Sequence, residues 1–197
     1  MKRVLFLALL TLALPMAALA NDQVDFVVSL NGTLGGDGNL ALISNITDVA
    51  GFNGGGLVQG SNLGTLSFST GSLLSTSGNI EKFAGGGSFT ISGNGQGGMP
   101  DGVIFSGMFK GPVELINMGR YGEELVCESF EGCSLTGKWY TGQTATGGIN
   151  LLMNSKGGVL VGYVSLQTGV VPEPSTLGLL GTGLLGLGAL VRRRIKG

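Results

Sequence analysis

Short apolar runs separated by glycine-containing turns are the feature that most constrains the fold of this chain. Asparagine or aspartate followed by glycine tolerates positive φ and therefore closes tight turns. Such dipeptides occur at Asn31-Gly32, Asn53-Gly54, Asn94-Gly95 and Asp101-Gly102. Between the turns, apolar residues recur with a period of two, as in Leu135, Gly137 and Trp139. Many short strands joined by such turns are typical of a β-sandwich or a barrel.

We therefore expect an all-β fold, an antiparallel β-sandwich or barrel-like domain of about ten short strands. The predicted strands are Val24–Leu30, Leu40–Ser44, Leu63–Thr70, Ser88–Ser92, Val103–Lys110, Val113–Asn117, Glu123–Cys127, Ser134–Thr141, Gly148–Met153 and Val159–Gln167. On the last two strands, alternation predicts one inward-facing row made of Ile149, Leu151, Met153, Leu160, Gly162, Val164 and Leu166. Helix is expected only at Asn45–Phe52 and in the two terminal segments.

The N-terminus has the pattern of a secretory signal peptide. Two basic residues precede an uninterrupted apolar run, Val4–Leu10, and Pro15 then breaks the helix. Ala18 and Ala20 follow with the small-x-small spacing of a signal cleavage site. We expect residues 1–20 to pass the chain through the secretion translocon and to be removed after Ala20.

Charge limits the partners of the part that remains. Between Asn21 and Val171 the sequence holds eleven acidic and five basic residues, a net charge of −6. Nucleic acid and anionic lipid surfaces attract clustered lysine and arginine, so this balance disfavours both. We expect no nucleic-acid partner.

The two cysteines, Cys127 and Cys133, lie close together in the sequence. In an exported chain such a pair indicates a disulfide, because oxidising compartments let the bond persist. Two free thiols are the alternative. A metal site would need more soft ligands, and the chain has no histidine to supply them. A bond across a hairpin end would fix the register of the flanking strands.

A second apolar segment lies near the C-terminus. Leu177–Val191 is a run of fifteen residues, which as a helix extends roughly 22 Å, short of a hydrocarbon core of about 30 Å. Such a helix spans the membrane only marginally and suits a transient stop. By the positive-inside bias, the basic cluster after it is expected at the cytoplasmic face. That cluster is Arg192, Arg193, Arg194 and Lys196.

The junction before this helix is built to stay extended. Pro172 and Pro174 forbid a continuous helix, and extended backbone is what a processing enzyme can bind. The order of a Val-Pro-Glu-Pro junction, an apolar helix and a terminal arginine cluster resembles the PEP-CTERM sorting signal. Exosortases, membrane-embedded transpeptidase-like enzymes of Gram-negative bacteria, recognise that signal.

Together with the signal peptide at residues 1–20, the resemblance divides the chain into three parts. It also predicts how the protein is exported and processed. Residues 21–170 form a glycine-rich cargo domain, and residues 171–197 form the signal, with motif 171–176, transmembrane helix 177–191 and basic tail 192–197. The resemblance implies recognition of Val171, Pro172, Glu173 and Pro174 and cleavage at or near them. It also implies an inner-membrane intermediate, then deposition at the surface or in the matrix of a Gram-negative bacterium, in association with exopolysaccharide or biofilm.

Catalytic groups are scarce. Without histidine, neither a Ser-His-Asp nor a Cys-His site can form. Paired carboxylates could hydrolyse glycosides, and the candidates are Glu123 with Glu124 and Glu128 with Glu131. A solvated charged loop around the predicted disulfide is the favoured interpretation.

Two glycine-rich stretches resemble binding motifs without their context. Gly93–Gly98 matches G-x-G-x-x-G, but a turn rather than a helix is expected after it. Gly35–Asn39 is similar to one turn of a calcium-binding repeat and occurs once. We expect no cofactor and no metal.

These observations predict an exported, non-catalytic surface or matrix protein. The alternative is a carbohydrate-binding module for the organism's own exopolysaccharide. Trp139 and Tyr140 are the adjacent large aromatics; alternation places Trp139 in the core with Leu135 and turns Tyr140 outward. A sugar platform would require an exposed aromatic ring beside polar side chains.

Overall fold

The computed structural model of the chain describes residues 22–29, 35, 38–128, 131–154 and 156–168. The predicted signal peptide, sorting motif and C-terminal helix lie outside these residues. The described strands belong to one compact unit, Asp22–Gly169. They are β1 (Asp22–Ser29), β2 (Asn39–Ala50), β3 (Val58–Ser77), β4 (Ile80–Phe83), β5 (Gly86–Asn94), β6 (Asp101–Lys110), β7 (Val113–Asn117), β8 (Glu123–Cys127), β9 (Ser134–Trp139), β10 (Thr144–Met153) and β11 (Val159–Thr168).

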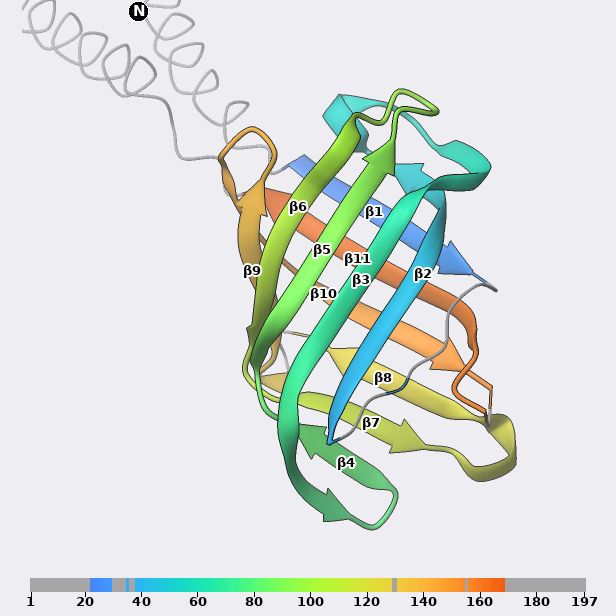
Figure 1. The fold of residues 1–197 in the computed structure, drawn as a ribbon, viewed down its shortest axis with the longest axis vertical. Helices are drawn as coiled ribbons and strands as arrows, with labels where there is room; N and C mark the ends of the chain where they lie inside the picture. Colours follow the sequence, from blue (N-terminus) through green and yellow to red (C-terminus); the bar gives the residue numbers. More distant parts are fainter. Residues whose placement is uncertain (1–21, 30–34, 36–37, 129–130, 155, 169–197) are drawn as a thin grey trace, which may run out of the picture. The chain divides into compact units, whose positions relative to one another are not determined.

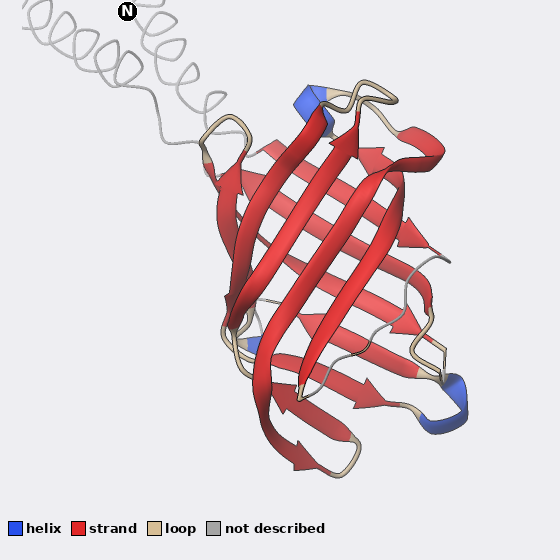
Figure 2. Cartoon of the chain, viewed as in Figure 1, coloured by secondary structure: helices blue, strands red, loops and turns tan. Residues whose placement is uncertain are grey.

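Two single 3₁₀ turns, η1 (Phe52–Gly54) and η2 (Gly119–Tyr121), complete the regular structure. Strands make up nearly all of it (Figure 2). In the described ranges we find no helix with the length and apolar character needed to cross a membrane.

The strands form two crossing layers around one core. Strands β2, β3, β5 and β6 run side by side in the front layer, and β1, β11, β10, β8 and β7 cross behind them (Figure 1). Side chains from both layers meet in the middle, where the largest fully buried ones include Phe26, Phe89, Phe105, Phe109 and Ile149. Removing such side chains from water is the main force that holds the two layers together.

All neighbouring strands are antiparallel, which confirms the predicted all-β antiparallel fold, and they belong to one sheet. The strand order is β11-β1-β2-β3-β4-β7-β8-β10-β9-β6-β5, with further pairings between β11 and β10 and between β3 and β5. These two pairings close the sheet on itself. Each of the eleven described strands consequently has hydrogen-bonded neighbours on both sides.

The sheet branches because β3 and β10 change partners along their length. Residues 64–69 of β3 pair with β5, whereas residues 73–77 pair with β4. Residues 144–147 of β10 pair with β9, and residues 149–153 pair with β8. One branch of the sheet is therefore β5-β6-β9, and the other is β4-β7-β8.

The chain crosses between the branches where backbones approach closely. Gly111, between β6 and β7, has φ +92°, and a Cβ there would collide with the carbonyl oxygen of Gly132, in the connection between β8 and β9. Only glycine combines that conformation with that contact. Glycine weakens regular strands, but at position 111 it is required for the crossing.

All ten predicted strands are present, and the predicted bounds of β7 and β8 match the observed ones. Strand β4 was not predicted, because four residues next to a turn carry too little alternation to be recognised. Trp139 is buried, with Leu135 on the same face of β9, as predicted. Ile149, Leu151 and Met153 also form the predicted buried row.

The helix expected at Asn45–Phe52 is wrong. Residues up to Ala50 belong to β2, and only the single turn η1 follows. Ile46 and Val49 are both buried, although Val49 follows Ile46 by three positions along the chain. In the structure a bulge at Thr47, where Val27 and Val28 of β1 face Asp48 and Ile46, returns both side chains to the inner face.

The predicted inward position of Leu160 is also wrong, and the cause is the same. Leu152 faces Val161 while Met153 faces Val159, so Leu160 is the extra residue of a bulge. Leu160 is 40% exposed, and Val159 takes the inward position. Gly162, Val164 and Leu166 face inward as predicted.

Candidate functional site: a groove on the outer face of β10 and β11

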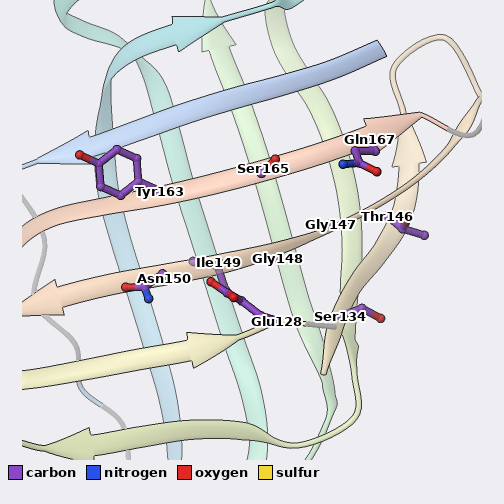
Figure 3. Close-up of a pocket in the computed structure, with 10 residues that line it drawn as sticks. All are labelled: Glu128, Ser134, Thr146, Gly147, Gly148, Ile149, Asn150, Tyr163, Ser165 and Gln167. Atoms are coloured by element: carbon purple, nitrogen blue, oxygen red, sulfur yellow. The ribbon is translucent and has the colours of Figure 1, made fainter. Parts of the chain in front are cut away.

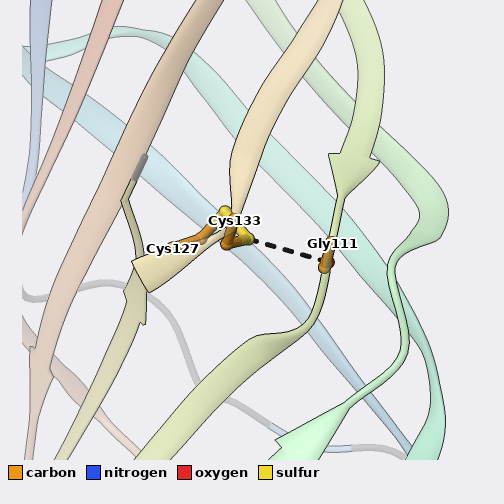
Figure 4. Close-up of a disulfide and its surroundings, with 3 residues drawn as sticks. All are labelled: Gly111, Cys127 and Cys133. Carbon is orange, nitrogen blue, oxygen red and sulfur yellow. Dashed lines mark hydrogen bonds between the residues drawn. A yellow bond between two sulfur atoms is a disulfide. The ribbon is translucent and has the colours of Figure 1, made fainter. Parts of the chain in front are cut away.

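The predicted disulfide is present and joins Cys127 to Cys133 with 4.9 Å between their Cα atoms (Figure 4). Both cysteines are buried, and Sγ of Cys133 lies 3.7 Å from the carbonyl oxygen of Gly111. Because the oxidised sulfur carries no hydrogen, this is a packing contact with the crossing between the branches.

The bond does not cross a hairpin end, contrary to expectation. Strands β8 and β9 do not pair with each other; both pair with β10, where Cys127 faces Ile149 and Leu135 faces Gly147. The disulfide thus joins two strands that follow one another along the same edge of β10. It holds the two branches together at the point where β10 changes partners.

The predicted processing residues lie outside the described residues and stay predictions. They are the signal cleavage residues Ala18 and Ala20, the sorting motif Val171, Pro172, Glu173 and Pro174, and the basic cluster Arg192, Arg193, Arg194 and Lys196.

The structure places the two candidate carboxylate pairs, Glu123 with Glu124 and Glu128 with Glu131, in two different arrangements. Glu123 and Glu124 are adjacent on β8, so the pleat turns them to opposite faces of the sheet. Glu124 points outward and accepts a hydrogen bond of 2.9 Å from the Nδ2 amide of Asn150. Glu128 and Glu131 both belong to the connection closed by the disulfide, where the Glu131 amide donates to the Glu128 carbonyl oxygen.

Carboxylates gather on the outer face beside this connection. The pKa of Glu131 is raised, first by desolvation and then by the charges of Glu114, Glu128 and Glu124. Lys82 opposes them and forms a 2.6 Å ion pair with Glu114. Within the described ranges no group of three or more His, Cys, Asp or Glu residues is arranged to hold a metal ion.

Next to these carboxylates, a groove of about 320 Å³ opens on the outer face of β10 and β11 (Figure 3). The strand register places Thr146 opposite Gln167, Gly148 opposite Ser165, and Asn150 opposite Tyr163. Three cross-strand pairs therefore follow one another along the groove. Its lining residues are Glu128, Ser134, Thr146, Gly147, Gly148, Ile149, Asn150, Tyr163, Ser165 and Gln167.

Glycine forms the floor of the groove, and larger side chains stand around it. Tyr163, which is 57% exposed, and Asn150 lie at one end, with Thr146 and Gln167 at the other (Figure 3). Glu128 lies along the side, and its Cγ is 3.5 Å from the position that a Cβ on Gly148 would take. A Cβ at position 148 would also lie 2.8 Å from the carbonyl oxygen of Cys127, so a larger residue does not fit there without a shift of the backbone.

Much of the polar lining is available to a ligand. The side chains of Thr146, Ser165 and Gln167 make no hydrogen bond to another described residue, and neither does the hydroxyl of Tyr163. Asn150 uses one amide hydrogen on Glu124 and retains a second donor and its carbonyl oxygen. Hydroxyl, amide and carboxylate groups around one exposed aromatic ring suit a polar ligand with an apolar face.

Tyr140, the aromatic residue that sequence alternation turned outward, has another role. It is 45% exposed, but its ring stacks on Phe52 with 6.0 Å between centroids, and its hydroxyl donates to Oδ1 of Asn53 at 3.3 Å. Phe52 also contacts Trp139. These contacts fix η1 over the aromatic core.

Comparison with known protein families gives one match. Residues 170–194 match the model described as the PEP-CTERM protein-sorting motif. Comparison with curated proteins and comparison with solved structures find no match. The motif marks an exported protein that is anchored in the membrane until an exosortase cleaves it.

Proposed function

We propose that the chain is a non-catalytic protein of the cell surface or extracellular matrix of a Gram-negative bacterium, associated with exopolysaccharide or biofilm. In this proposal, cleavage at or near Pro172, Glu173 and Pro174 releases the strand domain from its C-terminal helix. The observation that carries the proposal is the match of residues 170–194 to the sorting motif.

Two further observations support a non-catalytic domain. The chain has no histidine, the usual general base near neutral pH. Glu123 and Glu124 lie on opposite faces of β8, so this pair cannot flank one glycosidic bond.

Processing is tested by replacing Pro172, Glu173 and Pro174 with alanine and fractionating the cells. We expect the full-length precursor to accumulate in the membrane fraction, while alanine at Ser67 on β3, which lies outside residues 171–176, leaves processing unchanged. Normal release of the mature domain from the triple variant would refute the sorting role. Mass spectrometry of the mature C-terminus locates the cut and identifies any attached group.

Glycan binding in the groove on β10 and β11 is the second candidate function. The exposed ring of Tyr163 can stack on a sugar, and Thr146, Ser165 and Gln167 supply free hydrogen-bonding groups beside it. The glycine floor lets a sugar ring approach the backbone. This combination is typical of sites that orient a polar ligand by a few placed groups.

We expect Tyr163→Ala to weaken retention of the processed protein on the organism's own exopolysaccharide by about tenfold, the size expected for losing a stacked aromatic contact. Tyr121→Ala is the matched control, because Tyr121 is 67% exposed and lies outside the groove. Equal retention of the wild type and the Tyr163 variant would remove the groove as the binding site.

A further inference from the structure

We infer that the groove on β10 and β11 prefers glycans whose sugars carry free amino groups, because a protonated amine can pair with Glu128. This inference rests on glycan binding in the groove, which is proposed above, and it specifies the chemical class of the glycan.

The lining of the groove is negatively charged. Among the ten described residues that line the groove, Glu128 is the only one with a carboxylate side chain, and none is basic. Its side chain lies along the side of the groove, and its Cγ is 3.5 Å from the position that a Cβ on Gly148 would take (Figure 3). A ligand seated on the glycine floor against Tyr163 therefore has a carboxylate beside it.

The surroundings of the groove are also rich in carboxylates. Glu124 is held at the Asn150 end by its hydrogen bond, and Glu114 and Glu131 lie on the same side. Lys82 pairs with Glu114 at 2.6 Å, which leaves the other carboxylates without an ion pair among the described residues. The pKa of Glu131 is raised, first by desolvation and then by these neighbouring carboxylates. Lys138 faces Thr144, two residues beyond Thr146 at the opposite end.

Acidic, neutral and amino glycans would interact differently with this groove. A uronate or sulfated glycan would bring a second negative charge against Glu128 and would be repelled. A neutral glycan would use the ring of Tyr163 and the free polar groups but would leave the carboxylate unpaired. An amino glycan satisfies both, because the ammonium group pairs with Glu128 while the sugar face packs on Tyr163.

The test compares two probes that differ at the amino group, which is charged in one and acetylated and neutral in the other. The processed protein is titrated with β-1,4-linked glucosamine oligomers and with their fully N-acetylated counterparts, at a pH where the amines are protonated. We expect the amino oligomer to bind about threefold to fivefold more tightly, the effect of one partly exposed ion pair. Galacturonic acid oligomers should bind most weakly.

Two variants separate the site from the net charge. Glu128→Gln should abolish the preference and leave binding of the acetylated oligomer unchanged. Asp101→Asn removes one negative charge at an exposed position on β6, outside the groove, and should leave the preference intact.

The outcomes distinguish this inference from glycan binding itself. The preference for amines is wrong if both oligomers bind equally or if galacturonate binds more tightly. If binding in that case still depends on Tyr163, glycan binding in the groove is retained. A preference that survives in Glu128→Gln also overturns the inference. If none of the oligomers or the native exopolysaccharide binds, or Tyr163→Ala has no effect, glycan binding in the groove fails together with the inference.

Discussion

Asp22, the first residue of β1, lies directly opposite Thr168, the last residue of β11. The strand domain therefore begins and ends at the same point of the sheet. Three residues separate Thr168 from Pro172, and this stretch reaches about 14 Å at full extension. Any enzyme that binds the Pro-Glu-Pro motif must work very close to the folded sheet.

The short spacing gives a prediction about processing. Deleting residues 169–171 would place Pro172 directly after β11, and we expect uncleaved precursor to accumulate because the motif is held against the sheet. Restoring three residues as Gly-Ser-Gly should restore cleavage, since length rather than sequence is required. Western blots of membrane and medium fractions measure both. Normal cleavage after the deletion would show that the spacing is unimportant.

Loss of the disulfide should destabilise the domain. Replacing Cys127 and Cys133 with serine removes the bond that joins β8 to β9 at the crossing between the branches. We expect the free energy of unfolding to fall by about 2–3 kcal/mol, as for a short closed loop with buried sulfurs. Urea denaturation measures the change, and reduction of the wild type should produce a similar loss. An unchanged midpoint would contradict this role.

Close packing at the crossing can be tested with two glycines. Gly111 and Gly142 have φ of +92° and +86°, but a Cβ would collide with Gly132 in the first case and meet open space in the second. Gly142→Ala should cost about 1–2 kcal/mol of stability from its conformation. Gly111→Ala should cost at least about 2 kcal/mol more because of the collision. Equal costs in thermal or urea unfolding would rule out the close contact.

Ser44 offers a stabilising substitution. Its side chain is 1% exposed on the inner face of β2, and its hydroxyl has no hydrogen-bond partner among the residues that the structure describes. Ser44→Ala removes an unsatisfied buried polar group and should raise the free energy of unfolding by about 1 kcal/mol. Ser67→Ala on the outer face of β3 is the control and should have little effect. A loss of stability in Ser44→Ala would show that the hydroxyl is satisfied.

The carboxylate cluster predicts a pH dependence. The folded-state pKa of Glu131 is raised by desolvation and by neighbouring carboxylates, so its contribution to stability is present at low pH and is lost as pH rises through that pKa. Glu131→Gln should therefore be more stable than the wild type at neutral pH. The difference should vanish below the ordinary value of 4.5. A pH-independent gain in Glu131→Gln would contradict the mechanism.

The sequence predicted the strands well where alternation is regular. The bounds of β7 and β8 followed from it directly, and so did the burial of Trp139. It failed at Thr47 and Leu160, where an extra residue changes which face the following side chains occupy. A bulge depends on the partner strand, so a period read along one segment cannot reveal it.

The groove was missed for a related reason. Tyr163, Asn150 and Gln167 occupy outward positions that resemble any solvated strand face when β10 and β11 are considered separately. Their common site exists because the register pairs Asn150 with Tyr163 and Thr146 with Gln167. The sequence instead indicated Tyr140 as the outward aromatic residue, but its ring stacks on Phe52. A test of outward aromatic residues on paired strands could have found Tyr163.

Closure of the sheet has a consequence for contacts between copies of the domain. Secreted proteins accumulate at high local concentration, where exposed strand edges recruit further copies into fibres. Each of the eleven described strands already has partners on both sides. Copies of this domain consequently meet through side chains such as those of the groove, and they can crowd together without being drawn into a shared cross-β ladder.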